Sequence, residues 1–254
     1  IRYGHGYDTV DVDACTKAGI IVTNIAGSTS EEVSNHALTL LLASARELKR
    51  LDMATTSGRW SEVYSRSILS RIYGETVGIV GFGWIGRAVA RKCKAFGMNV
   101  VVNDPYVGDH LAIEYGVEFV SKGELLKRSD YVTLHVPHLD GTHHYIDLSA
   151  LEAMKPSAYL INTSRGPVVD EKSLVYALQN NEIAGAGIDV FEEEPLSPAN
   201  PILNMENVIC TPHVAGSSKI GWEIIRRRAG EEAARILSGE RPNVIVNPEV
   251  LGRI

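Results

Sequence analysis

The sequence predicts an α/β protein built around a Rossmann-type, doubly wound parallel sheet. Two observations carry this prediction. Short runs rich in Val, Ile and Ala alternate with amphipathic helical patterns along most of the chain, as parallel strands joined by crossover helices require. A glycine-rich turn of the form G-x-G-x-x-G also follows one expected strand and precedes one expected helix, which is the context that makes this motif informative.

The expected strands are short, and they occupy residues 20–23, 77–80, 100–103, 131–135, 158–162, 185–189 and 208–210. The expected helices lie between them, at residues 31–51, 85–96, 123–127, 171–179 and 217–237. This order of elements indicates crossover connections, and hence a parallel sheet with helices on both faces.

The expected helix from Glu31 to Leu51 is long and apolar on more than one face. Ser28 and Glu31 have the spacing of a capping box, which marks a helix start. One apolar face of this helix packs within its own domain. The second face indicates either deeper burial or a subunit interface, and we favour an interface between two copies of the chain, a homodimer.

Length and composition bound the class of protein. The 254 residues allow one large domain or two modest ones. A hydrophobic fraction of 44% with 22% charged residues is ordinary for a soluble globular chain. A net charge of −6 argues against a nucleic-acid surface and gives no reason to expect a membrane partner. No apolar run approaches the roughly 18 residues of a membrane span.

Cysteine and histidine spacing argues against disulfides and metal sites. Cys15, Cys93 and Cys210 are odd in number and far apart, which favours a reducing cytoplasm. No cluster has zinc-ligand spacing. His143-His144 could be a metal pair, but adjacent residues rarely share one metal. A solvated turn is therefore the preferred interpretation, and we expect no metal.

The chain opens on Ile1 rather than Met, inside a strand-like run that leads to Gly4-His5-Gly6. No signal-peptide pattern follows. We therefore expect that a segment preceding Ile1 is missing from this sequence.

The glycine-rich turn predicts a dinucleotide site. Gly81 permits the tight turn, Gly83 lets the backbone approach a pyrophosphate, and Gly86 lets the helix pack closely on the strand. The helix N-terminus that follows offers free N–H groups and the positive end of its dipole to the phosphates.

Asp104 predicts which dinucleotide is bound. It ends the next strand, and it follows Gly86 by 104 − 86 = 18 residues, close to the spacing of about 20 for the acid that binds the adenosine ribose. Its carboxylate would repel a 2′-phosphate, so NAD is favoured over NADP. Alternatively, Asp104 only begins the turn at Pro105.

Three further segments follow later strands, at the sheet edge where open α/β sheets place ligands. They are residues 162–166, 189–195 and 211–216. Taken singly, Arg165 could be a surface arginine, Glu194 part of an acidic loop and His213 a turn histidine. Their order and their common place at strand ends favour one shared site.

These segments resemble the D-2-hydroxyacid dehydrogenase family. The matching stretches are GFGWIG, NTSRGPVVDE, AGAGIDVFEEEP and TPHVAGSS, which lie within residues 81–218. The resemblance extends back to GYDTVDVDACTKAGIIVTN and forward to GERPNVIVNPEV, so it covers nearly the whole chain. Four motifs in this order make it specific.

The resemblance implies catalytic roles. Arg165 would hold the substrate carboxylate with its planar guanidinium fork and polarise the C2 carbonyl. His213 would be the general acid and base, and Glu194 would orient its imidazole and favour the charged form. NAD would supply the hydride.

The resemblance also implies binding roles. His5 and Gly6 resemble the loop that receives the substrate carboxylate, and Asp189 resembles the acid near the nicotinamide carboxamide, with a strand-end cap as its alternative. The cofactor-binding set is Gly81, Gly83, Trp84, Ile85, Gly86, Asp104, Pro137, Thr163, Asp189 and Gly216.

The family pattern divides the chain into three parts. Residues 1–24 would end a flavodoxin-like substrate domain, residues 25–216 would form the NAD-binding domain, and residues 217–254 would return to the substrate domain. The expected reaction interconverts a small 2-keto acid and its D-2-hydroxy acid, with glyoxylate and hydroxypyruvate as leading candidates. An NADH-sensing, corepressor-like protein and a catalytically incomplete NAD-binding fragment are the alternatives.

Overall fold

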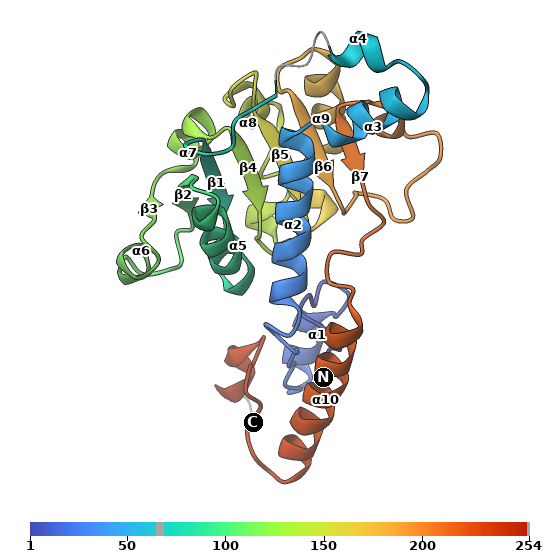
Figure 1. The fold of residues 1–254 in the computed structure, drawn as a ribbon. Coiled ribbons are helices and arrows are strands. Elements are labelled where there is room, and N and C mark those ends of the chain that lie inside the picture. The colour runs from blue at the N-terminus through green and yellow to red at the C-terminus, as the bar shows by residue number, and fades with distance from the viewer. Residues whose placement is uncertain (65–68, 253–254) are drawn as a thin grey trace. The chain divides into compact units, whose positions relative to one another are not determined.

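The computed structural model describes residues 1–64 and 69–252 of the chain (Figure 1). Two compact units divide the chain. The sheet unit is Val33–Ala215, and the terminal unit is formed by Ile1–Glu32 and Gly216–Ile254.

Within the described residues, the sheet unit contains one seven-stranded sheet in the order β3-β2-β1-β4-β5-β6-β7. Every neighbouring pair is parallel. The predicted Rossmann-type fold is thereby confirmed, and the strand order reverses between β1 and β4, where such sheets bind ligands. The strands are β1 (Thr76–Val80), β2 (Asn99–Asn103), β3 (Glu118–Phe119), β4 (Tyr131–Leu134), β5 (Tyr159–Asn162), β6 (Gly185–Ile188) and β7 (Val208–Cys210).

Helices cover both faces of the sheet and bury a separate core on each (Figure 1). On one face, Leu41 of α2 (Ser30–Ala45) and Val89 of α5 (Trp84–Ala95) pack with Ile79 of β1. On the other face, α7 (Lys122–Arg128), α8 (Leu148–Glu152) and α9 (Glu171–Gln179) pack against the sheet. A fully buried aliphatic side chain stabilises a fold by about 1.5–3 kcal/mol, so these cores hold the strand ends in place.

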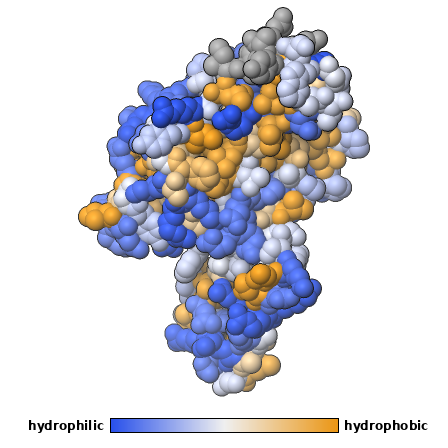
Figure 2. Space-filling model, in the orientation of Figure 1, coloured by the Kyte–Doolittle hydropathy of each residue, from blue (hydrophilic) through white to orange (hydrophobic). Residues whose placement is uncertain are grey.

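Shorter elements complete the sheet unit. They are α3 (Leu48–Thr56), α4 (Trp60–Tyr64), α6 (His110–Tyr115), and the 3-10 turns Asp140–Thr142, Gly166–Val168 and Pro201–Asn204. Figure 2 shows hydrophobic surface over the part of this unit where α2 crosses the sheet. Within residues 1–64 and 69–252, no helix is long and apolar enough to cross a membrane.

The terminal unit contains α1 (Val12–Lys17), α10 (Lys219–Leu237) and a 3-10 turn at Pro248–Gly252. Asn247, whose side chain is fully buried, joins the N-terminal and C-terminal segments of this unit. The Asn247 amide accepts from Val22 N at 2.8 Å and donates to Thr16 Oγ1 at 2.8 Å and to Ile20 O at 3.0 Å. One amide therefore fastens the two ends of the chain within this unit.

Two sequence predictions about local structure are wrong. Residues 20–23 do not form a strand, because the Asn247 side chain occupies backbone groups of Ile20 and Val22 that a ladder would use. Only a single parallel bridge forms there, between Arg2 and Asn24. The Ser28 hydroxyl donates to Ile25 O at 2.9 Å, and the expected capping box between Ser28 and Glu31 stays a prediction.

The helix expected from Glu31 to Leu51 is interrupted. It ends at Ala45, Glu47 takes a left-handed conformation with φ 47°, and α3 begins at Leu48. Glu47 N bonds back to Ser44 O at 2.9 Å, and Arg50 Nε donates to the Glu47 carboxylate at 2.6 Å. These local bonds stabilise the break, which redirects the chain after one apolar helix.

Candidate functional site

The glycine-rich loop joins β1 to α5 with the geometry of a phosphate-binding turn. Gly81 has φ 90°, a value that side-chain-bearing residues rarely adopt. A Cβ on Gly86 would lie 2.1 Å from Gly81 O, whereas a Cβ on Gly83 would meet nothing within 4 Å. The loop is therefore closed against its own helix and open at Gly83. Gly83 caps α5 without a side-chain hydrogen bond, so the first N–H groups of α5 face this open side.

Phe82 anchors the loop, and the sequence interpretation did not include it. Its ring is fully buried. It meets Tyr115 and Phe119 edge-on, at centroid distances of 5.4 and 5.5 Å. An aromatic residue between two glycines was the available signal. The contact holds the turn rigid, so that its backbone groups are preorganised.

Asp104 has a structural role in addition to the one expected from sequence. Its Oδ2 accepts from Phe82 N at 2.7 Å, and its Oδ1 accepts from Tyr106 N at 2.9 Å. An ionised carboxylate has about four acceptor positions, so two remain for ribose hydroxyls. Asp104 thus ties the end of β2 to the glycine-rich loop, and its ribose role stays a prediction.

The surroundings of the loop fit a dinucleotide. Thr163 Oγ1 and His135 Nδ1, which follow β5 and β4, are buried and have no hydrogen-bond partner among the described residues. Trp84 is 62% exposed at the start of α5, and the Arg87 guanidinium stacks on its ring at 5.2 Å. Unsatisfied buried polar atoms and a cation beside free helix N–H groups are what a pyrophosphate and its riboses would engage.

Burial lowers the pKa of His135 to about 3. The unfolded imidazole takes up a proton below about pH 6.5, so the folded state binds fewer protons between those two values. The contribution of neutral His135 to the free energy of unfolding is therefore fully present above about pH 6.5 and is lost as the pH falls towards about 3. His135 therefore makes the sheet unit sensitive to acid.

We expect His135→Gln to flatten the acid side of the stability curve. Glutamine keeps a polar atom within reach of Thr133, which lies 3.0 Å from His135 Nε2, but it does not titrate. The free energy of unfolding, measured with urea between about pH 7 and pH 4, should fall by up to about 1.4 kcal/mol less per pH unit in the variant than in the wild type. Parallel curves for the two proteins would refute the assignment.

Glu194 and His213 are brought together at the ends of β6 and β7. His213 Nδ1 lies 2.7 Å from Glu194 Oε2, and the other Glu194 oxygen accepts from Phe191 N at 3.0 Å. The two side chains are 47% and 35% exposed. His213 takes a left-handed conformation with φ 55°. The carboxylate therefore fixes one ring nitrogen and leaves Nε2 for chemistry.

Arg165 belongs to the same edge of the sheet. Buried Asn162 shapes its turn, since Asn162 Oδ1 accepts from Ser164 N and Asn162 Nδ2 donates to Arg165 O, both at 3.0 Å. A Cβ on Gly166 would lie 1.8 Å from Phe191 O. The Arg165 turn thus packs closely against the loop that carries Glu194. Arg165, Glu194 and His213 follow the neighbouring strands β5, β6 and β7, so all three lie at the same edge of the sheet.

Asp189 is fully buried and organises the turn that carries His213. Its carboxylate accepts from Thr211 Oγ1 at 2.6 Å, Val214 N at 3.0 Å and Ala215 N at 2.9 Å. Sequence reasoning placed Asp189 near a nicotinamide. That contact stays a prediction. The structure also shows that the Asp189 carboxylate binds backbone amides, which cannot be predicted from a residue pattern.

The remaining predicted site residues lie in other parts of the described chain. Pro137 follows β4, and Ile85 is in the first turn of α5. Gly216 belongs to the terminal unit, as do His5 and Gly6. Within that unit, His5 O accepts from Asn24 Nδ2 at 2.5 Å, and His5 Nδ1 accepts from Gly27 N at 3.2 Å. Their substrate-binding and cofactor-binding roles stay predictions.

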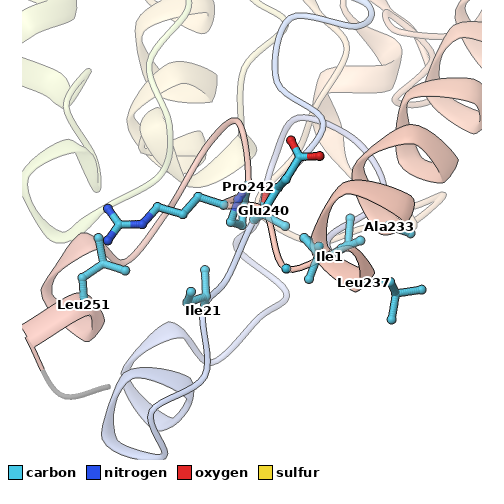
Figure 3. A pocket seen from close by; sticks show the side chains of 11 residues that line it. Ile1, Ile21, Ala233, Leu237, Glu240, Pro242 and Leu251 are labelled. Atoms are coloured by element: carbon cyan, nitrogen blue, oxygen red, sulfur yellow. The ribbon is translucent and has the colours of Figure 1, made fainter.

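A hollow of about 730 Å³ opens within the terminal unit (Figure 3). Its lining is mainly apolar and includes Ile1, Ile21, Ala233, Leu237 and Leu251. Figure 3 also labels Glu240 and Pro242 there. The polar side chains of Thr23, Glu240 and Arg241 complete the lining.

Among the residues that the structure describes, the side chains of His144, Asp170 and Glu192 have possible metal-ligand atoms within 4.8 Å of one another. His144 Nε2 lies 2.7 Å from Glu192 Oε1, and Asp170 caps α9. Partial burial raises the pKa of Asp170, but the hydrogen bonds that its carboxylate accepts from Ser173, together with nearby His144, outweigh burial and hold the pKa below its ordinary value. These polar atoms already have partners inside the protein. The His143 and His144 rings stack at 4.0 Å.

Comparison with known proteins gives a consistent result. Residues 38–215 match the family model described as "D-isomer specific 2-hydroxyacid dehydrogenase, NAD binding domain". The chain is 42% identical to a glyoxylate reductase of Korarchaeum cryptofilum, over 98% of the chain and 76% of that protein. It is 39% identical to a D-3-phosphoglycerate dehydrogenase of Methanocaldococcus jannaschii, over 97% of the chain and 47% of that protein.

A solved structure agrees with these sequence relatives. The D-lactate dehydrogenase of Aquifex aeolicus, crystallised with NAD and lactic acid, superposes with a TM-score of 0.84 at 34% identity. That superposition covers 94% of this chain and 75% of the other.

Proposed function

The chain belongs to the family of D-isomer specific 2-hydroxyacid dehydrogenases, and from that premise we propose that Arg165, Glu194 and His213 carry out its reaction. Its relatives include a glyoxylate reductase and a D-lactate dehydrogenase crystallised with NAD, so the reaction class is the interconversion of a 2-keto acid and a D-2-hydroxy acid. The observation that carries the proposal is the 2.7 Å pair of His213 and Glu194 at the ligand-binding edge of the sheet.

Each residue has a chemical task that its geometry supports. Arg165 binds the substrate carboxylate and draws electron density from the C2 carbonyl, because its planar fork matches a carboxylate. NADH, when bound, supplies the hydride to C2. His213 gives the proton on Nε2 to the carbonyl oxygen, and it takes that proton back in the oxidation direction. Glu194 holds the ring by Nδ1 and stabilises the imidazolium by its charge.

The substrate we favour is glyoxylate or hydroxypyruvate. Several relatives at 38–42% identity are named glyoxylate reductases, and these keto acids are small. The test is NADH oxidation by the chain with glyoxylate, hydroxypyruvate, pyruvate, 2-oxoglutarate and phosphohydroxypyruvate in turn. Turnover of one small acid supports the proposal. NADH binding without turnover of any acid would contradict it and favour the NADH-sensing or incomplete-fragment alternatives.

We expect Asp104→Ala to weaken NADH binding much more than NADPH binding. The lost carboxylate removes hydrogen bonds to the ribose of NADH, whereas for NADPH it also removes a repulsion of the 2′-phosphate. Fluorescence titration of both nucleotides measures the two dissociation constants. Because Asp104 also accepts from Phe82 N, part of the loss is common to both nucleotides. Equal losses would make Asp104 purely structural.

A homodimer and a cytoplasmic location complete the proposal. Leu48 and Met53 of α3 are 57% and 41% exposed. These exposed apolar side chains, at the end of the Glu31 to Leu51 region and just beyond it, support a subunit interface there. The three cysteines are free thiols, which agrees with a reducing compartment. Sedimentation of the chain at several concentrations tests the dimer.

A further inference from the structure

We propose that His36, on α2, is a positioning residue for His213. It lies 175 positions from Thr211 in the sequence, yet His36 Nε2 is 2.9 Å from Thr211 Oγ1. It is also 3.5 Å from Asp189 Oδ1. The inference rests on the proposed role of His213, and it adds a residue that the motifs of the active site do not include.

The proton positions in this cluster follow from a count of donors. Thr211 has one hydroxyl proton, which goes to Asp189 Oδ1 at 2.6 Å. The Thr211 oxygen can therefore only accept from His36, and His36 Nε2 carries the proton. His36 therefore donates to Thr211, and Thr211 donates to Asp189, so that these three side chains form one series of hydrogen bonds.

This series of hydrogen bonds ends at the backbone of the turn that carries His213. Asp189 O accepts from His213 N at 2.8 Å, and its carboxylate accepts from Val214 N and Ala215 N at 3.0 and 2.9 Å. One residue thus holds three consecutive amides. A left-handed conformation such as that of His213 persists only where the surroundings over-determine it, and these bonds supply the restraint.

His36 completes the restraint from outside the turn. Its side chain is 21% exposed, and the Asp189 side chain has no exposed surface. If His36 is removed, the Thr211 hydroxyl loses the donor that sets its rotamer, and the carboxylate of Asp189 is free to shift. His213 would then meet Glu194 less often in the 2.7 Å geometry, although no group that touches substrate or cofactor has changed.

The test uses three variants, His36→Gln, His36→Asn and His36→Leu. The glutamine amide nitrogen reaches the place of Nε2, whereas asparagine is one methylene too short and leucine has no donor. We expect kcat to fall about 10-fold in the asparagine and leucine variants and to stay within about 3-fold in the glutamine variant. The loss should fall mainly on kcat and only slightly on NADH affinity, because the glycine-rich loop is unchanged in all three. Should His36→Leu fail to fold, the Gln and Asn pair still decides.

A second measurement is independent of turnover. Amide hydrogen exchange at Val214 and Ala215 should be faster in His36→Asn and His36→Leu than in the wild type, and restored in His36→Gln. If the chain reduces no keto acid, this readout still tests His36 and so separates this inference from the proposed function. Equal kcat and equal exchange for Gln and Asn would overturn the proposal.

A double variant gives the last check. Thr211→Val removes the hydroxyl that links His36 to Asp189. If His36 acts through Thr211, His36→Leu combined with Thr211→Val should be no slower than Thr211→Val alone. Independent, multiplicative losses would show that His36 acts by packing alone.

Discussion

His213→Ala should lower kcat by about 100- to 10,000-fold, because the carbonyl oxygen loses its proton donor in the transition state. NADH affinity should be nearly unchanged, since the ring is paired with Glu194 rather than with the glycine-rich loop. Stability should also change little, because the side chain is 47% exposed. Steady-state kinetics and nucleotide titration measure these quantities separately.

The chain offers a matched control for this variant. His144 is also paired with a glutamate, at 2.7 Å, and is similarly exposed. It is not among the residues proposed to touch the substrate, so His144→Ala should retain nearly full kcat. An unaltered kcat in His213→Ala, or an equal loss in His144→Ala, would remove His213 from its proposed role as acid and base.

Gly86→Ala should abolish NADH binding by breaking the loop, with an affinity loss of at least about 100-fold, or about 2.7 kcal/mol. The added Cβ would lie 2.1 Å from Gly81 O, and a backbone atom cannot move aside cheaply. The helix must separate from the strand end, so the melting temperature should fall as well. Nucleotide titration and thermal unfolding measure the two effects.

Gly83→Ala is the informative partner of that variant. Its Cβ would meet nothing within 4 Å, so the melting temperature should match that of the wild type. NADH affinity should nevertheless fall, because the methyl group occupies the open side where the pyrophosphate backbone must approach. If Gly83→Ala binds NADH as tightly as the wild type, the nucleotide does not approach the loop at Gly83.

Local patterns were sufficient to predict the sheet and its glycine-rich loop. Six of the seven expected strands form within one or two residues of their predicted bounds, because short β-branched runs between helices have few alternatives. The loop followed from glycine spacing, since its closure depends on contacts inside one strand–turn–helix unit.

Features that depend on distant parts of the chain could not be predicted in this way. Glutamate favours helices, so the residue type at position 47 does not predict the left-handed break between α2 and α3. Residues 20–23 have the composition of a strand, but Asn247 decides their hydrogen bonding from the other end of the sequence. The amides held by Asp189 are likewise invisible to residue patterns, because every residue that is not proline has one.

The most direct test of the central claim is transfer of deuterium from NADH labelled at C4 of its nicotinamide to a prochiral keto acid such as hydroxypyruvate. If Arg165, Glu194 and His213 form the active site, the wild type should give product with deuterium at C2 and the D configuration, and His213→Ala should give almost none. Product of the L configuration, or deuterium transfer undiminished in His213→Ala, would contradict the claim that Arg165, Glu194 and His213 form the active site of this dehydrogenase.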